Sequence, residues 1–316
     1  RGLGDVYKRQ LMERPIPLYV GSGSPLSNVG TLTNQGIELE VGYKLSVDKV
    51  NLSFLANASY VKNEIKNLGN QTGYIDKESL PTLGTVSRNQ NGYPIGYFFG
   101  YKAIGVFQTQ EEIDNYISPA TGKPIQPNAV PGDTKFEDLN GDGVISDDNE
   151  DRTMIGKPNP DWIVGLTVAA DWNGFDLSAF FQGSFGADVF DALRRYELAA
   201  VNYTSDALER WTGPGTSNSM PRIVLGDTPK NFRPSTLLVH DASFLRLRNL
   251  QVGYTLPAQL TRKAYIQRLR FYASFDNLLT ITGYKGMDPE IGSTMGIDKG
   301  VYPQARVYTF GLNLTF

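Results

Sequence analysis

The last eleven residues, Arg306–Phe316, constrain the fold most, because they alternate between two kinds of side chain. Small polar residues or glycine separate five apolar residues, Tyr308, Phe310, Leu312, Leu314 and Phe316. A period of two indicates a β-strand with two different faces. An apolar, aromatic-bearing face opposite an uncharged polar face is typical of a transmembrane β-barrel strand. A strand of a soluble β-sandwich has the same period, so this stretch alone leaves both folds open.

The same alternation recurs along the chain and predicts further strands. We expect them at Gly36–Leu45, Asn51–Asn63, Trp162–Trp172, Phe175–Phe181, Phe244–Leu256 and Leu269–Phe275, with a weaker one at Leu11–Leu18. The alternation slips in phase near Asn249, which indicates a β-bulge. Helical periodicity within the long connections predicts short helices at Glu111–Ile117, Val189–Ala200 and Asp206–Trp211.

Short and long connections alternate between these strands. The short ones are Ser46–Val50, Asn173–Gly174 and Pro257–Gln267, and the long ones are Tyr19–Gln35, Glu64–Pro160, Gly183–Asp241 and Asn277–Tyr302. If Phe316 lies at the periplasmic edge, every short connection is periplasmic and every long one extracellular, as in bacterial outer-membrane barrels. The sequence therefore predicts an all-β chain, an antiparallel transmembrane β-barrel segment of about eight strands with long extracellular loops that carry short helices. Loops of this length favour a slice of a larger barrel.

Composition excludes several other classes of protein. The chain has 316 residues and 40% hydrophobic content, without an apolar run long enough for a membrane-spanning helix. The net charge of −3 and the lack of a basic face argue against nucleic acid as a partner. Cysteine is absent, which removes thiol catalysis, zinc–thiolate sites and disulfides.

Several motifs together span most of the chain from Asn34 to Phe316. They are Asp241–Asn249, Gly253–Pro257, Asn277-Leu278 with Tyr284–Glu290, Trp211-Thr212 with Pro221-Arg222, and Asp138–Ile145 followed by Asp151-Arg152 and Gly156–Pro160. Together they resemble the late barrel of one transporter family, the SusC/RagA family of TonB-linked outer-membrane proteins (TonB-dependent receptors). The motifs Asp241–Asn249 and Asp288–Glu290 weigh against the competing siderophore and cobalamin receptors.

The resemblance implies a function and a set of partners. It implies a large barrel in the outer membrane of Bacteroidetes-type Gram-negative bacteria that imports oligosaccharides or peptides with energy passed through TonB. A SusD-like lipoprotein would cap the barrel from outside, and outer-membrane lipid would surround it. Residues 11–316 are then expected to be the C-terminal part of the barrel, with the plug domain and the TonB-binding segment N-terminal to it. Residues 1–10 match poorly and are expected to be an unmatched start or an artefact.

An acidic stretch within the longest loop has the opening spacing of an EF-hand-type calcium loop. Oxygen-bearing side chains stand at positions 1, 3 and 5, glycine at 6 and a backbone carbonyl at 7. Position 12, where a bidentate acid belongs, is Asn149. The candidate metal residues are Asp138, Asn140, Asp142, Val144, Asn149, Glu150 and Asp151. Two interpretations stay open: a structural Ca²⁺ site, and an Asx-rich turn held by its own hydrogen bonds. No other cofactor is expected.

Four aromatic residues in the loops are candidates for contact with a substrate or partner. They are Tyr97, Phe99, Tyr101 and Trp211. Aromatic rings of this kind stack on sugar rings or meet a partner protein, and they also pack loops together. We favour packing.

No residue pattern predicts catalysis. His240 is the only histidine and stands beside no nucleophile elbow. Glu38 and Glu40 resemble an acid pair of a glycoside hydrolase, but positions i and i+2 also share the wet face of any strand. We therefore expect no enzyme. The alternative function is a secreted, calcium-stabilised β-domain that binds carbohydrate or acts as an adhesin.

Overall fold

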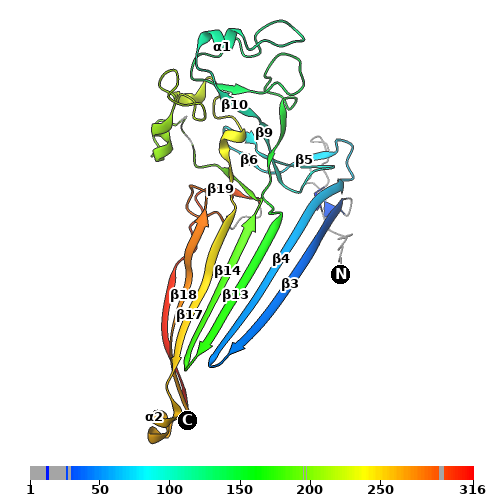
Figure 1. Cartoon of the computed structure of the whole chain (residues 1–316). Helices are drawn as coiled ribbons and strands as arrows, with labels where there is room; N and C mark the ends of the chain where they lie inside the picture. The colour runs from blue at the N-terminus through cyan, green and yellow to red at the C-terminus, as the bar shows by residue number, and fades with distance from the viewer. Residues whose placement is uncertain (1–11, 14–25, 28–29, 195, 197, 292–294) are drawn as a thin grey trace.

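The computed structural model describes residues 12–13, 26–27, 30–194, 196, 198–291 and 295–316. A tall, curved sheet forms one half of the molecule, and a head of loops and small sheets sits above its upper end (Figure 1). The described residues contain no helix that is long and apolar enough to cross a membrane.

The main sheet is an antiparallel meander of seven strands. They are β3 (Thr31–Val47), β4 (Val50–Asn67), β13 (Trp162–Trp172), β14 (Phe175–Phe185), β17 (Phe244–Thr255), β18 (Arg268–Thr282) and β20 (Val307–Thr315). Their order is β20-β18-β17-β14-β13-β4-β3, so each strand pairs with the nearest strands of this set in the chain. All six predicted inner strands and the closing strand are confirmed.

The expected strand count of about eight exceeds the seven observed. The eighth prediction, Leu11–Leu18, lies mostly outside the described residues. Of this stretch, Met12–Glu13 forms β1, which pairs with β2 (Leu26–Ser27) in a separate two-stranded sheet.

Each short connection turns the chain at the lower end of the sheet, and the long connections Glu64–Pro160, Gly183–Asp241 and Asn277–Tyr302 rise into the head (Figure 1). The long connection Tyr19–Gln35 lies mostly outside the described residues. Asn173 and Gly174 have φ values of 48° and 91°, which suit a two-residue hairpin turn of the I′ type. The connection from β17 to β18 contains α2 (Ala258–Thr261) and the 3₁₀ turn η5 (Arg262–Ala264). The predicted separation of short and long connections is therefore confirmed.

The phase slip near Asn249 is a bulge between β17 and β18. Leu247 pairs with Leu279 and Asn249 pairs with Asp276, so Arg248 stands opposite two residues of β18. One of these two, Asn277, has a φ of 53°, a left-handed conformation that asparagine tolerates better than most residues. The bulge shifts Leu250 back onto the apolar face.

The head is built from short strands drawn from three of the four long connections, Glu64–Pro160, Gly183–Asp241 and Asn277–Tyr302. Its sheets are β12-β9-β8-β5, β10-β11, β16-β15-β19 and β6-β7. Their bounds are β5 Tyr74–Asp76, β6 Ser79–Leu80, β7 Gly84–Thr85, β8 Ser87–Gln90, β9 Tyr97–Tyr101, β10 Ala103–Val106, β11 Thr134–Phe136, β12 Arg152–Gly156, β15 Asp188–Asp191, β16 Val239–Asp241 and β19 Ile297–Asp298. A core of Val86, Phe98, Phe190, Leu238 and Ile297 joins these connections into one body.

The helical predictions for the loops are partly wrong. The first helix exists as the short α1 (Gln110–Asp114), capped by the Thr109 hydroxyl. The stretch at 206–211 is instead the 3₁₀ turn η2 (Ser205–Glu209), and two more such turns are η3 (Leu225–Asp227) and η4 (Thr236–Leu238). The helix expected at Val189–Ala200 is wrong at its start, because β15 (Asp188–Asp191) occupies that part of the chain. Val189 and Phe190 pack into two different cores, which requires an extended strand.

Candidate functional site

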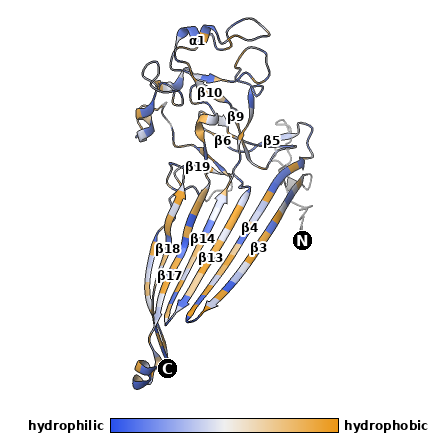
Figure 2. Cartoon of the chain, viewed as in Figure 1, coloured by the Kyte–Doolittle hydropathy of each residue, from blue (hydrophilic) through white to orange (hydrophobic). Residues whose placement is uncertain are grey.

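The register of the main sheet places its apolar side chains on one face. Directly paired positions form apolar rows across all seven strands, such as Tyr43, Phe54, Val168, Ala179, Leu250, Phe275 and Tyr308. The next row is Leu45, Leu52, Ala170, Leu177, Val252, Ala273 and Phe310. Figure 2 shows the resulting alternation along each strand.

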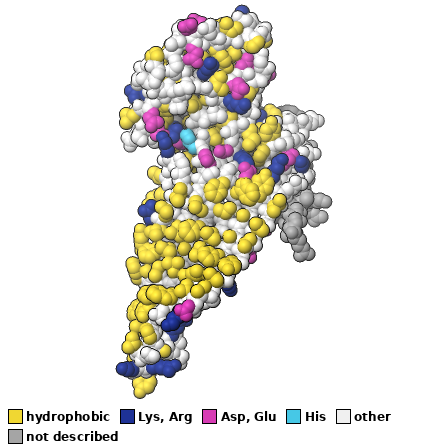
Figure 3. Space-filling model, in the orientation of Figure 1, with side chains coloured by type: hydrophobic (Ala, Val, Ile, Leu, Met, Phe, Trp, Pro, Cys, Tyr) yellow, Lys and Arg dark blue, Asp and Glu magenta, His cyan; other side chains and the backbone are white. Residues whose placement is uncertain are grey.

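This apolar face is uncovered. Ile37 is 73% exposed, Leu39 62% and Phe310 75%. In Figure 3 the apolar side chains gather in a band over the sheet, with charged side chains above the band and below it. A continuous exposed band of this kind, bounded by charge, fits contact with lipid hydrocarbon, because water would penalise so large an apolar surface.

The opposite face of the sheet is polar. One row contains Glu40, Asn57, Gly165, Gln182, Arg246 and Thr280, and a lower row contains Ser46, Asn51, Asp171, Asp176, Gly253, Tyr272 and Gly311. An ion pair joins the strands on this face, with Arg270 Nε 2.8 Å from Asp176 Oδ1. Glu38 and Glu40 both lie exposed on the same face, where strand geometry alone accounts for their proximity.

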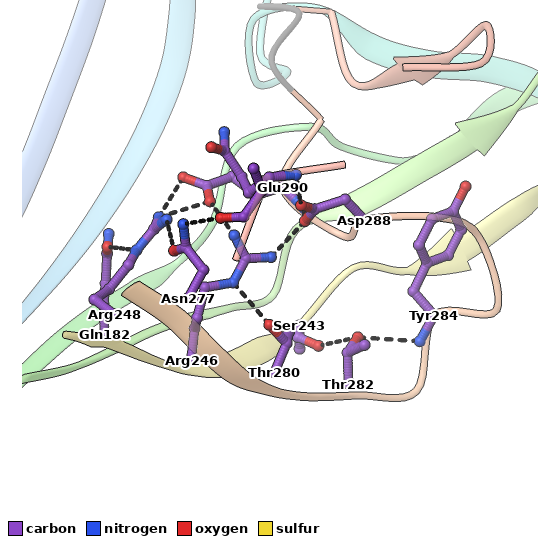
Figure 4. Close-up of polar contacts among 12 residues, drawn as sticks. Gln182, Ser243, Arg246, Arg248, Asn277, Thr280, Thr282, Tyr284, Asp288 and Glu290 are labelled. Atoms are coloured by element: carbon purple, nitrogen blue, oxygen red, sulfur yellow. Dashed lines mark hydrogen bonds and ion pairs between the residues drawn. The ribbon is translucent and has the colours of Figure 1, made fainter. Parts of the chain in front are cut away.

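A charged cluster clamps a loop over the upper part of this polar face (Figure 4). Arg246 projects from β17, and its side chain is only 2% exposed. It donates from Nε to Thr280 Oγ1 (2.9 Å) and from Nη1 to Glu290 Oε2 (3.0 Å), and its Nη2 pairs with the Asp288 carboxylate. A guanidinium presents its donors in a planar fork, so one side chain bonds both acids at once.

The bulge residue Arg248 adds a second arm to the clamp. Its Nε donates to Gln182 Oε1 of β14 (2.7 Å), and its Nη2 lies 2.6 Å from both carboxylate oxygens of Glu290. Its Nη1 donates to Asn277 Oδ1 (3.3 Å). Two arginines of β17 therefore hold one glutamate of the loop, and Arg248 at the bulge also contacts an asparagine of β18.

Asp288 is the buried acid of the clamp. Burial acts to raise its pKa, but the backbone N–H groups of Gln304 and Glu290 and the Arg246 guanidinium hold the pKa below its usual value. The two N–H donors lie 3.0 and 2.9 Å from the carboxylate oxygens. Asp288 thus ties its own loop, β17 and the segment leading to β20 together.

Tyr284 fixes the start of the same loop. Its hydroxyl donates to Asp298 Oδ2 of β19 (2.7 Å), and burial together with that contact raises the pKa of the phenol. His240 packs beside the Tyr284 ring, with Nε2 3.9 Å from Asp191 Oδ2. Burial and the nearby Arg194 lower the pKa of His240.

The predicted metal residues form a hydrogen-bonded loop. Asp138 accepts the N–H groups of Gly141 (2.8 Å) and Gly143 (2.9 Å), and Asn140 donates to Asp142 and Glu150. Asp151 accepts the N–H groups of Leu139 and Ser146, Asn149 contacts Arg152, and Val144 is exposed. Within the described ranges no group of three or more histidine, aspartate or glutamate side chains is arranged to hold a metal ion. Asx-turn bonding is present, and a Ca²⁺ site stays a prediction.

The candidate aromatic residues lie inside the head. Tyr97, Phe99 and Tyr101 alternate along β9 and are 1, 2 and 4% exposed. Trp211 packs on Gly132 and donates from Nε1 to Gln108 Oε1 (3.2 Å). These positions favour packing over direct ligand contact, and a role in binding a substrate or partner stays a prediction.

The arginine clamp was missed as a site by sequence reasoning. Its charged residues lie inside the motifs Asp241–Asn249 and Tyr284–Glu290, but the sequence motifs did not indicate that the arginines of the first contact the acids of the second. The available signal was Arg246 and Arg248 on the polar parity of a strand, which calls for acidic partners when such charges are buried.

No family model matches the chain. Among curated proteins, it is 33% identical to TonB-dependent receptor P3 of Formosa agariphila over 97% of this chain and 31% of that protein. It is 30% identical to TonB-dependent receptor SusC of Bacteroides thetaiotaomicron over 92% of this chain and 27% of that protein. The chain thus spans about a third of the length of the curated relatives it matches.

Solved structures of the RagAB transporter are also similar to this chain. The RagAB peptide transporter matches with a TM-score of 0.75 and 27% identity, over 97% of this chain and 32% of that chain. The RagAB peptide importer in its open-open state matches with a TM-score of 0.75 and 26% identity, over 99% of this chain and 32% of that chain.

Proposed function

Because the chain is of the SusC/RagA type of TonB-dependent receptor, we propose that it forms a barrel wall in an outer-membrane receptor that imports nutrients. The observation that carries the proposal is the seven-stranded sheet with one continuous apolar face and one predominantly polar face. The apolar face contacts lipid and the polar face lines an aqueous passage. The role is binding and translocation, without covalent chemistry.

The proposed cargo is an oligosaccharide or a peptide. One structural relative is named as a peptide transporter, which supports a peptide, and SusC is a relative in the same family. The proposed partners are TonB, reached through a segment outside this chain, and a SusD-like lipoprotein on the extracellular side. The clamped loop at the upper end of the sheet would border the entrance that such a lipoprotein covers.

Cell fractionation tests the location and class of the protein. The receptor that carries this chain should sediment with the outer membrane, resist a high-salt wash and be released by detergent. Release by salt alone would support the alternative, a secreted adhesin or carbohydrate-binding domain, and would overturn the proposal.

Uptake measurements test the activity. Cells that lack the receptor should lose accumulation of a labelled oligopeptide or oligosaccharide, and deletion of TonB should cause the same loss. Loss of one labelled class and retention of the other identifies the cargo. Uptake of both classes at the parental rate in the deletion strain would contradict import.

A further inference from the structure

A cavity of about 430 Å³ opens in the head, away from the arginine clamp. Its charged lining residues are Arg152, Lys230, Arg233, Asp147 and Asp227, and Tyr101 is one of its aromatic lining residues. Three cations therefore meet two carboxylates around one space. A cavity of this volume holds a small ligand or one end of a larger one.

Two of the cations are guanidinium groups held rigidly against aromatic rings. The Arg152 guanidinium carbon lies 4.3 Å from the Phe99 ring centroid and 5.7 Å from that of Tyr101. The Arg233 guanidinium carbon lies 4.7 Å from the Tyr101 centroid and 4.9 Å from that of Phe136. Stacking on rings favours one orientation of each guanidinium without supplying a full negative charge to pair with it.

Arg152 contacts only neutral acceptors. It donates to the carbonyl oxygens of Thr85 and Phe99 and to Asn149 Oδ1. Among the described residues no carboxylate lies within ion-pair distance of it, and its buried Nε has no acceptor. Burial lowers the pKa of this guanidinium, because the protein interior disfavours its positive charge. Buried charges are normally paired.

Asp147 is shared between the other two cations. Asp147 pairs with Lys230, and its Oδ1 lies 4.0 Å from Arg233 Nη1, an atom that is buried and has no hydrogen-bond acceptor. The Asp227 carboxylate accepts the backbone N–H groups of Asn231 (2.8 Å) and Phe232 (2.9 Å). The described residues that line the cavity thus include three cationic and two carboxylate side chains, a formal excess of one positive charge.

We propose that this cavity binds an oxyanion, a carboxylate or sulfate group carried by the ligand of the receptor. That this ligand is the transported cargo rests on the proposed function. Binding of the anion in the cavity does not depend on transport. Arg152 and Arg233 would supply the counter-charge, and Lys230 would close the exposed side. A free peptide C-terminus and an acidic or sulfated sugar are the two sources of such a group.

Calorimetric titration of the full-length receptor in detergent tests the site at constant ionic strength. The probes are sodium sulfate, dialanine and galacturonate, and the neutral counterparts are N-acetyldialanine amide and galactose. We expect saturable binding of sulfate and of at least one carboxylate probe, and none of the neutral counterparts. Binding of dialanine but not of galacturonate indicates a peptide C-terminus. Binding of galacturonate but not of dialanine indicates an acidic sugar.

Variants decide whether the cavity is responsible. Arg233→Gln should weaken binding of the anionic probe by about tenfold or more, because hydrogen bonds to charged groups are the strong ones. Lys230→Gln, at a half-exposed side chain, should weaken it less and leave folding unchanged. Lys299→Gln is the matched control, since this exposed lysine pairs with Glu78 outside the cavity. Equal affinity in Arg233→Gln, Lys230→Gln and the control would overturn the site.

Two further measurements separate this proposal from the proposed function. Heat-dependent mobility on detergent gels reports folding, so a loss of binding counts only for a variant that migrates as folded. Absence of anion binding in the unmodified, folded receptor with normal uptake contradicts the site alone. Binding of the anion by a receptor whose deletion leaves all uptake unchanged contradicts the import function alone.

Discussion

Arg246 and Asp288 show at the level of single residues why the clamp depends on both partners. The two side chains are 2% and 6% exposed, so each buried charge depends on the other, and Glu290 is a second partner of Arg246. Removing one partner of a buried ion pair typically costs about 3 kcal/mol or more, because the remaining charge stays desolvated.

Asp288→Asn should therefore release the loop that follows β18. We expect hydrogen–deuterium exchange in residues 283–291 of the full-length receptor to rise by about 100-fold, which corresponds to about 3 kcal/mol. Exchange in β13 and β14 should stay unchanged. Glu78→Gln is the control, because its pair with Lys299 is solvent-exposed and contributes little. Equal effects of both substitutions would contradict a buried clamp.

The lowered pKa of Asp288 predicts how the stability of the loop changes at acidic pH. The folded pKa of Asp288 lies below its usual value, so the stabilisation is complete above the unfolded value of about 3.9 and disappears as pH falls through the folded pKa. Exchange in the loop, corrected for the intrinsic rate, should stay constant from about pH 7 to pH 5 and rise below about pH 4. Loosening already between pH 7 and pH 5 would indicate another group, such as His240.

At the level of the strand, adjacent residues lie on opposite faces of the sheet, one apolar and one polar. In β13, Val168 stands in an apolar row between Phe54 and Ala179, and Ala169 stands in the row of Ser53 and Ser178. A single strand therefore provides a matched pair of positions at almost the same depth.

Val168→Arg should be far more harmful than Ala169→Arg. An arginine on the lipid face near the middle of the bilayer costs about 2–4 kcal/mol, and one on the wet face is expected to cost less than about 1 kcal/mol. Urea unfolding of the full-length receptor in lipid vesicles measures both. Similar losses for the two variants would contradict the assignment of the faces.

At the level of the whole molecule, the sheet has two open edges. Among the described strands, β3 pairs only with β4, and β20 pairs only with β18. Unpaired edges and an uncovered apolar face are both aggregation hazards.

The 316-residue chain expressed by itself should accordingly form inclusion bodies. The relatives are about three times as long, and we expect co-expression with the remainder of the receptor to move the chain into the membrane fraction. Centrifugation and size-exclusion chromatography measure the outcome. A soluble, monodisperse monomer would contradict the prediction.

Much of the strand architecture could be predicted because its determinants are local. Whether a residue such as Val168 or Ala169 faces lipid or water follows from its parity, and the slip at Asn249 marked the bulge. The turn at Asn173-Gly174 is likewise specified by residues that tolerate positive φ. The helix predicted from Val189 was wrong because two cores in the head impose an extended backbone there.

The amino-acid sequence by itself determined the two-faced strands, their order and the side on which each connection lies, because period-two patterning and turn residues act within a few positions. Only the tertiary structure decided which charges meet. Arg246 reaches Asp288 from 42 residues away, and Arg152 and Arg233 come together from different loops. Such pairings depend on register and loop packing, in which the free energy of burying a charge is set by neighbours that the local sequence does not specify.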